Sequence, residues 1–367
     1  MHVRYSPLRQ QYADPEPIFA ELRQLVASGD FTLGKVVGEF ERMFADMLGV
    51  KHAIGVGSGT DACKIPLKAL GVGYGDEVIT CANTFWATVG AINEVGARPV
   101  FVDCDDSFCL KVDQIEAAIT QRTKALMPVH LTGDAADMPR IMEIAAKHKL
   151  PVVEDGCQSL LGEIDGRRVG SFGVATAFSM HPLKIINVWG DAGVIVTNDD
   201  EMARTARLLC NHGLKSRDEM EMLGYNTRLD SMQAVVGKYI VRQTRDIVEK
   251  RAVNAAYYDA GFKGIAGVRI PPRNPRVKNV YLLYILFVER RDELLRYCIN
   301  RSIEAKVHYP IPLYQQKALA PLGYKPGSFP VTDRHARESI TFPVDQHLAR
   351  AEMDYVIETV RNFYAGK

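Results

Sequence analysis

Three short stretches of the sequence combine residue types that could do chemistry where predicted strands end. The first, Gly55-Val56-Gly57-Ser58-Gly59-Thr60, follows a predicted strand and opens a predicted helix. Free N–H groups at a helix start attract anions, and small residues let a ligand approach the backbone closely. The glycine spacing matches neither the dinucleotide fingerprint nor the Walker loop. The stretch therefore predicts either a phosphate site or a tight turn that merely needs glycine.

The second and third stretches supply a carboxylate and an amine. Residues 152–158 end a buried strand with Asp155, which could hold a cationic ring nitrogen, bind magnesium or cap a helix. Residues 178–184 follow a later strand and end on Lys184, whose alternative role is that of a solvated lysine. A phosphate cradle, a pyridinium partner and an imine-forming amine are the parts that pyridoxal phosphate needs. Their coincidence in one chain favours that cofactor.

These residues must be positioned by a sheet, and the first 200 residues alternate between short β-branched runs and amphipathic helical segments. Such alternation predicts crossover units and a mainly parallel sheet in an α/β domain. Helices are expected at Asp61–Leu70, Trp86–Val95 and Met138–His148. The seven expected strands are Ala53–Val56, Glu77–Thr80, Arg98–Val102, Ala125–Pro128, Val152–Asp155, Val174–Ser179 and Val194–Thr197.

After about Leu229 the pattern changes, which indicates a second unit. We expect a large domain over residues 1–245 with a mostly parallel seven-stranded sheet, and a smaller C-terminal α+β domain over residues 246–367. The N-terminal segment is free to pack on the small domain. The expected elements are one helical stretch from Asp230 toward Tyr258, strands at Val280–Val288 and near Ala305–His308, and helices at Asp292–Asn300 and Ala351–Tyr364.

Composition excludes several classes of protein. The chain has 367 residues, of which 47% are hydrophobic, and 45 basic residues stand against 44 acidic ones. This balance argues against nucleic-acid binding, and no apolar run approaches the length of a membrane span. The nine histidines show no metal-binding spacing, so no metal site is predicted. Seven cysteines without framework spacing fit a reducing compartment, so we expect a soluble, cytoplasmic protein.

The sequence resembles the DegT/DnrJ/EryC1/StrS family of sugar aminotransferases over nearly the whole chain. The order and spacing of the motifs carry this resemblance, more than any one motif alone. The motifs are Thr32-Leu33-Gly34, Phe40-Glu41, Ser58-Gly59-Thr60-Asp61-Ala62, Thr84-Phe85-Trp86-Ala87-Thr88, Pro128-Val129-His130-Leu131-Thr132-Gly133, Glu154-Asp155 with Gln158, Ser179 through Lys184, Gly224-Tyr225-Asn226-Thr227-Arg228, His308-Tyr309-Pro310 and Phe342-Pro343.

The resemblance implies a fold-type-I pyridoxal-phosphate enzyme and assigns roles to single residues. Lys184 matches the family's Schiff-base lysine, Asp155 the carboxylate that pairs with the pyridine nitrogen, and Gln158 the amide near the phenolic oxygen. The other implied cofactor residues are Ser58, Gly59, Thr60 and Ser179 at the phosphate, Phe85 on the ring face, and Asn226, which reaches the neighbouring site across a homodimer. The implied substrate residues are Trp86, His308 and Tyr309.

The resemblance implies transfer of an amino group to a keto sugar, with L-glutamate as donor. Related sugar dehydratases carry histidine at the lysine position, so Lys184 favours transamination, and His181 is expected to be a local packing or hydrogen-bonding residue. The alternatives are another pyridoxal-phosphate reaction on a sugar or cyclitol ketone, and a catalytically silent regulatory homologue. Two departures from the family pattern, Trp86 and Trp189-Gly190-Asp191-Ala192-Gly193, leave the sugar open, either nucleotide-linked or phosphorylated. The second departure resembles members that act on sugars without a nucleotide, such as phosphorylated keto sugars.

Overall fold

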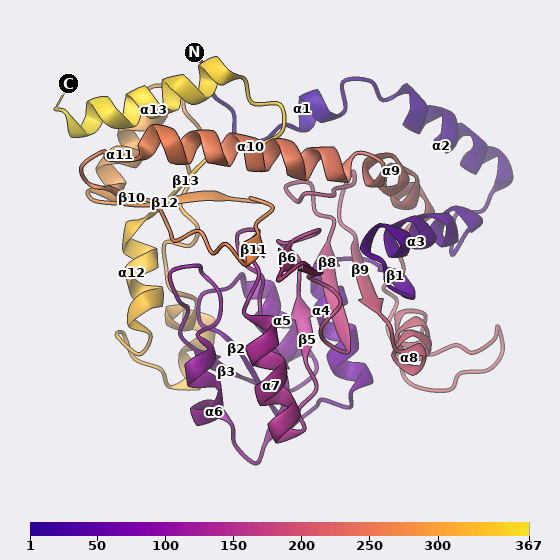
Figure 1. Ribbon diagram of the computed structural model, residues 1–367. Coiled ribbons are helices and arrows are strands. Elements are labelled where there is room, and N and C mark those ends of the chain that lie inside the picture. The colour runs from indigo at the N-terminus through magenta and orange to yellow at the C-terminus, as the bar shows by residue number, and fades with distance from the viewer. Residues whose placement is uncertain (367) are drawn as a thin grey trace.

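The computed structural model describes residues 1–366, and a seven-stranded sheet lies at its centre (Figure 1). A four-stranded sheet of order β1-β9-β8-β5 and a three-stranded sheet of order β3-β2-β4 are joined where β4 and β5 form two parallel bridges. Only β9 runs against its neighbours, so the mostly parallel sheet is confirmed. The strands are β1 (His52–Val56), β2 (Glu77–Cys81), β3 (Arg98–Val102), β4 (Thr123–Met127), β5 (Val153–Asp155), β8 (Ala175–Ser179) and β9 (Gly193–Thr197).

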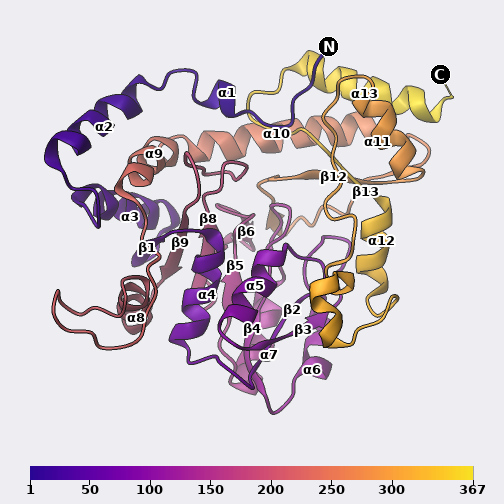
Figure 2. The same ribbon diagram turned by 180° about the vertical axis from the view of Figure 1, so that it is seen from behind.

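Helices cover both faces of this sheet, as its almost wholly buried strands require. Neighbouring strand residues point to opposite faces, so that Val153 packs in one core and Val152 in the other. Figure 2 shows α4 and α5 in front of the sheet, and Figure 1 shows α7 on the opposite side. The helices of this part are α1 (Leu8–Gln11), α2 (Glu16–Ser28), α3 (Lys35–Leu48), α4 (Gly59–Ala69), α5 (Trp86–Glu94), α6 (Ile115–Ala118), α7 (Met138–His148) and α8 (Asp200–Cys210).

The C-terminal part builds a third core around a small antiparallel sheet of order β10-β12-β13. Val3 packs in this core and bridges Ile303, so the first residues of the chain lie on the C-terminal part. The elements are β10 (Val268–Arg269), β12 (Tyr284–Val288), β13 (Ser339–Phe342), α11 (Arg291–Ile299), α12 (Pro330–Glu338) and α13 (Arg350–Tyr364), with β6 (Glu163–Ile164), β7 (Arg167–Arg168) and β11 (Val277–Lys278) forming a separate ribbon.

The helical stretch expected from Asp230 is two helices, α9 (Ser231–Val241) and α10 (Thr244–Phe262). The Thr244 hydroxyl donates to the Ile240 carbonyl at 2.9 Å, a local bond that bends helices. The chain changes direction there, because α9 packs on the large sheet's helices whereas α10 runs toward α13 (Figure 1). The domain boundary predicted at residues 245 and 246 falls in the first turn of α10 and stays a prediction.

Two predicted strands are shorter than expected. The strand predicted over Val280–Val288 begins only at Tyr284, because the N–H groups of Val280 and Leu283 bond to the carbonyls of Gly133 and Thr132. Those bonds hold residues 280–283 against the large domain and away from the small sheet. The strand predicted near Ala305–His308 is a single bridge between Lys306 and Thr341.

Candidate active site

One cavity of about 260 Å³ lies where the large sheet, the C-terminal part and the N-terminal segment meet. It opens at the carboxyl ends of β5 and β8, the edge at which parallel sheets place ligands. Its lining includes ten of the predicted residues, namely Ser58, Gly59, Thr60, Phe85, Asp155, Gln158, Ser179, Lys184, His308 and Tyr309. Trp86 and Asn226 are not among the residues that line it.

The start of α4 forms the cradle at one side of this cavity. The Ser58 side chain caps the helix by accepting the Asp61 N–H at 3.1 Å, which leaves the N–H groups of Gly59 and Thr60 without intrahelical partners. A Cβ placed on Gly59 would lie 2.6 Å from the Ser179 Cβ, so only glycine lets α4 approach the end of β8 this closely. Free N–H groups beside a serine hydroxyl fit a phosphate.

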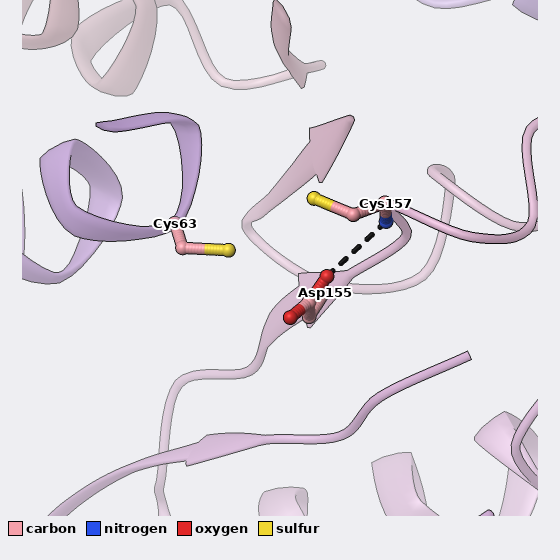
Figure 3. Close-up of side chains that lie close together, drawn as sticks. All are labelled: Cys63, Asp155 and Cys157. Carbon is pink, nitrogen blue, oxygen red and sulfur yellow. Dashed lines mark hydrogen bonds between the residues drawn. The ribbon is translucent and has the colours of Figure 1, made fainter. Parts of the chain in front are cut away.

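The Asp155 carboxylate is buried at the cavity floor and held from two sides. Thr88 Oγ1 donates to Asp155 Oδ2 at 2.7 Å, and the Cys157 N–H donates to Asp155 Oδ1 at 3.1 Å (Figure 3). Strand alternation sends the neighbouring Glu154 to the opposite face. A carboxylate fixed here, across the cavity from an anion cradle, suits the cationic ring nitrogen of pyridoxal phosphate.

Glu154 is fully engaged away from the cavity. It accepts from the Gly173 N–H at 2.8 Å, from Thr176 Oγ1 at 2.9 Å and from His130 Nε2 at 3.1 Å. His130 Nδ1 accepts the Ala136 N–H, so Nε2 carries the ring proton. Burial opposes ionisation of Glu154, but these donors more than offset burial, and the pKa of Glu154 lies below its usual value. Glu154 is therefore a structural carboxylate, and Asp155 is the one that faces the cavity.

Gln158 presents its amide N–H group to the cavity. Its Oε1 accepts the Thr132 N–H at 2.9 Å, and its Nε2 donates to the Tyr309 hydroxyl at 3.2 Å. The first bond fixes which end of the amide faces the cavity. Burial raises the pKa of Tyr309 to about 12, so its hydroxyl stays protonated. A fixed amide donor here suits an anionic phenolic oxygen.

Lys184 extends into the same cavity from the loop after β8. Within residues 1–366 its Nζ has neither a hydrogen bond nor an ion-pair partner. Burial lowers the pKa of Lys184, against the opposing effect of Cys157 and Asp155. Asn187 holds the backbone of this turn by donating to the Lys184 carbonyl at 3.1 Å. An unpaired amine with a depressed pKa is suited to react as a nucleophile.

Aromatic rings form the outer wall of the site. The Phe85 ring centroid lies 4.4 Å from that of Trp86 and 6.1 Å from that of Tyr309. Trp86 is 59% exposed and stands at the rim. His308 Nδ1 lies 2.9 Å from Thr341 Oγ1, and burial lowers the pKa of His308 to about 4, so its ring is neutral at physiological pH. The predicted substrate residues thus gather at one side of the cavity mouth.

Asn226 lies on a different surface. It is exposed and lines a second hollow together with Gly57, Asp61 and Thr32, on the outer side of the loop that forms the phosphate cradle. Its own chain therefore does not bring it into the main cavity. Exposed apolar side chains stand nearby in sequence, with Leu223 81% and Met220 58% exposed.

The loop that departs from the family pattern is divided between two environments. Asp191 lines the cavity, whereas Trp189 packs edge-on against Tyr12 and Phe19. The Trp189 N–H donates to Gln233 Oε1, and Gln233 Nε2 donates to the Trp189 carbonyl. His181 is exposed, and its Nδ1 accepts the Leu183 N–H at 3.2 Å, in agreement with a local hydrogen-bonding role.

Several residues at the site were missed from the sequence. Cys63, Tyr5 and Gln11 line the cavity, and Thr88 bonds to Asp155. The sequence patterns marked none of these four as a site residue. The spacing of Thr84 and Thr88, one helical turn apart, was the only available signal for Thr88. Nothing local marks the N-terminal residues, because their place depends on the Val3 contact with the C-terminal core.

No helix in the described range 1–366 combines the length and the apolar character needed to span a membrane.

The comparisons with known proteins agree with this geometry. The model of the DegT/DnrJ/EryC1/StrS aminotransferase family matches residues 13–361. A dTDP-3-amino-3,4,6-trideoxy-alpha-D-glucose transaminase of Micromonospora megalomicea subsp. nigra is 38% identical over 99% of this chain and 98% of its own. A pleiotropic regulatory protein of Geobacillus stearothermophilus is 39% identical over 99% of both chains. The crystal structure of NtdA from Bacillus subtilis with bound cofactor PMP superposes with a TM-score of 0.93 at 29% identity, over 99% of this chain and 85% of that one.

Proposed function

The chain belongs to the DegT/DnrJ/EryC1/StrS aminotransferase family, and from that premise we propose that it converts a keto sugar to an amino sugar with L-glutamate as donor. It is a fold-type-I, pyridoxal-phosphate-dependent aminotransferase. The observation that carries the proposal is the unpaired Lys184 amine in one cavity with the Asp155 carboxylate and the α4 cradle. The keto sugar is nucleotide-linked or phosphorylated, and the nucleotide sugar in the name of the Micromonospora relative supports the first.

Each cofactor residue has a separate task in this proposal. Gly59, Thr60 and Ser179 hold the phosphate, with Ser58 fixing the helix start. When bound, the cofactor supplies an electron sink that lowers the cost of removing an α-proton. Asp155 holds the ring nitrogen in its charged form, since an opposite charge favours that form.

The remaining residues orient the reacting groups and exclude water. Gln158 would donate its amide N–H to the phenolic oxygen of the cofactor, and the Phe85 ring would cover one face of the cofactor ring. Lys184, whose pKa is lowered by burial, would move a proton at its Nζ beside the donor carbon, and proximity would make that transfer effectively intramolecular. The sugar lies against Trp86, His308 and Tyr309 at the cavity mouth.

Assembly as a homodimer completes the site in this proposal. Asn226 of one chain would reach the phosphate of its neighbour, which is supported by its exposure beside the outer side of the cradle loop. The exposed Leu223 and Met220 nearby would be covered by the second chain. We place the enzyme in the cytoplasm, where its seven free thiols would remain reduced.

A direct test combines cofactor attachment with amine transfer. Borohydride reduction of the cofactor-loaded protein should fix the cofactor to Lys184, located by peptide mass spectrometry. Lys184→Ala should still bind the cofactor but transfer no amine from labelled glutamate to a panel of keto sugars, some nucleotide-linked and some phosphorylated. Attachment to another lysine would overturn the site. Cofactor attachment without transfer to any sugar would favour the regulatory alternative.

A further inference from the structure

Two thiols flank the Asp155 carboxylate at the floor of the cavity (Figure 3). Cys63 lies on α4, one helical turn after Gly59, and Cys157 lies in the turn that follows β5. The two sulfur atoms and a carboxylate oxygen all lie within 4.8 Å of one another. Three side chains able to ligate a metal ion therefore converge at one point, although Cys63 is far from the other two in sequence.

The carboxylate keeps capacity for a further ligand. Thr88 uses one lone pair of Oδ2 and the Cys157 N–H uses one of Oδ1, and the remaining contacts are with the two thiols, whose protons a metal ion would replace. The Cys157 sulfur contacts the carbonyls of Ala177 at 3.8 Å and Gly59 at 4.0 Å, and it also interacts with the Cys63 thiol and the Asp155 carboxylate. Both cysteines line the cavity, so a small cation can reach them from solvent when the cofactor is absent.

Two sulfurs and one carboxylate oxygen select a particular class of cation. Thiolates favour zinc and its softer relatives over magnesium or calcium, and zinc accepts carboxylate as well. With zinc–sulfur bonds of about 2.3 Å, two ligands of a tetrahedral ion stand about 3.8 Å apart. The observed separations need to close by only about 1 Å at most to reach this geometry. A water from the cavity would take the fourth position.

The charges of the site also balance around a divalent cation. Two thiolates and one carboxylate exceed the charge of a dication by one negative unit. The Lys184 amine extends into the same cavity, where it can take up one of the protons that the thiols release and so neutralise the excess. Thiols packed beside a carboxylate hold their protons until a metal ion replaces them. Coordination displaces the two thiol protons, of which one can pass to Lys184 while the other leaves to solvent.

We propose that the cofactor-free chain binds one thiophilic divalent cation, of the Zn²⁺ or Cd²⁺ type, through Cys63, Cys157 and Asp155, and that this cation and the cofactor exclude each other. The exclusion rests on the proposed function, in which Asp155 holds the ring nitrogen. A carboxylate that coordinates a dication does not also pair with a pyridinium. Such metals would therefore bind the cofactor-free form, whereas bound cofactor would protect the loaded form from them.

Cadmium titration tests the site without any turnover measurement. Cofactor-free protein, kept reduced, should show a thiolate-to-cadmium absorption band in the ultraviolet that saturates at one cation per chain, with release of protons to the solvent. Cys63→Ala should lose the band and weaken binding by more than about tenfold, since even outer-shell partners of metal ligands command that range. Cys210→Ala, which removes a buried thiol on α8, is the matched control. This variant should keep both the absorption band and the affinity for cadmium.

Competition tests the exclusion. Protein loaded with cadmium and freed of excess metal should take up pyridoxal phosphate only after a chelator is added, whereas Cys63→Ala should take it up at once. Absence of a saturable band, or a band that survives in Cys63→Ala, overturns the site. A saturable band with unhindered cofactor uptake overturns the exclusion. Neither result touches the proposed function, which would fail separately if metal-free protein placed no cofactor on Lys184.

Discussion

The Thr88 hydroxyl donates a 2.7 Å hydrogen bond to the Asp155 carboxylate across the gap between α5 and β5. Thr88 is completely buried, and its Oγ1 also lies 2.8 Å from Thr84 Oγ1. A chain of two hydroxyls therefore orients the carboxylate from the side opposite the Cys157 N–H. Thr88 does not line the cavity, so it acts as a positioning residue for Asp155.

Replacing Thr88 with valine should weaken cofactor binding, because the shape is kept while a hydrogen bond to a charged group is lost. Such a bond contributes about 1.5–3 kcal/mol, so we expect a roughly tenfold to hundredfold rise in the cofactor Kd by absorbance titration. Thr88→Ser should restore most of the affinity. Thr80→Val, which removes a buried hydroxyl bonded to the Met127 carbonyl, is the control. Equal cofactor affinity in Thr88→Val and Thr80→Val would show that Thr88 has no positioning role.

Gly59→Ala should impair the phosphate cradle, since the new Cβ would lie 2.6 Å from the Ser179 Cβ and neither atom has a rotamer that relieves the contact. We expect a free energy of unfolding lower by about 1–3 kcal/mol and a cofactor Kd raised at least about tenfold. Gly90→Ala, on α5 with nothing within 4 Å, should instead stabilise by about 0.5–1 kcal/mol. Urea unfolding and cofactor titration of both variants test this prediction. A cofactor affinity equal to wild type in Gly59→Ala would contradict the role of Gly59 in the phosphate cradle.

Glu154 should make the protein sensitive to acid. Its folded pKa is depressed, so its ionised form stabilises the fold fully above the unfolded value of about 4.3, and this stability is lost as the pH falls through the lower folded value. Glu154→Gln should reduce the free energy of unfolding by about 3 kcal/mol at neutral pH and flatten its decline below pH 4.3. Glu116 is an exposed carboxylate paired with Lys147. Glu116→Gln should therefore change neither the free energy of unfolding at neutral pH nor its decline in acid. An unchanged acid limb in Glu154→Gln would refute this account.

A mixed dimer should reveal whether Asn226 serves its neighbour. Lys184→Ala and Asn226→Ala homodimers should both be weak. If sites are shared, their heterodimer has one site with both defects and one with neither, so mixing should restore part of the amine-transfer activity. If Asn226 serves its own chain, every site keeps one defect. No recovery after confirmed subunit exchange would therefore exclude a shared site.

Much of the architecture is determined by local sequence. Period-two and continuous apolar runs placed all seven strands of the large sheet to within about two residues, because strands buried on both faces must be apolar. The turn after a strand then dictates where a polar side chain emerges, which is why Asp155 and Lys184 could be recognised. Local patterns also set α7 at Met138–His148.

Tertiary packing decided what local patterns do not encode. The break between α9 and α10 arises because the two helices pack on different parts of the molecule. Residues 280–283 leave the strand pattern because the loop at Thr132 and Gly133 takes their hydrogen bonds. In both places a contact with a distant segment overrides the local preference of the chain.

The same distinction applies within the site. Sequence by itself determined which strand ends carry the carboxylate, the amide and the amine. Only the tertiary structure decided that Thr88 orients Asp155, that Cys63 stands beside Cys157, and that Asn226 faces away from its own cavity. These relations join residues on separate elements, and their distances depend on how helices and strands pack rather than on any spacing along the chain.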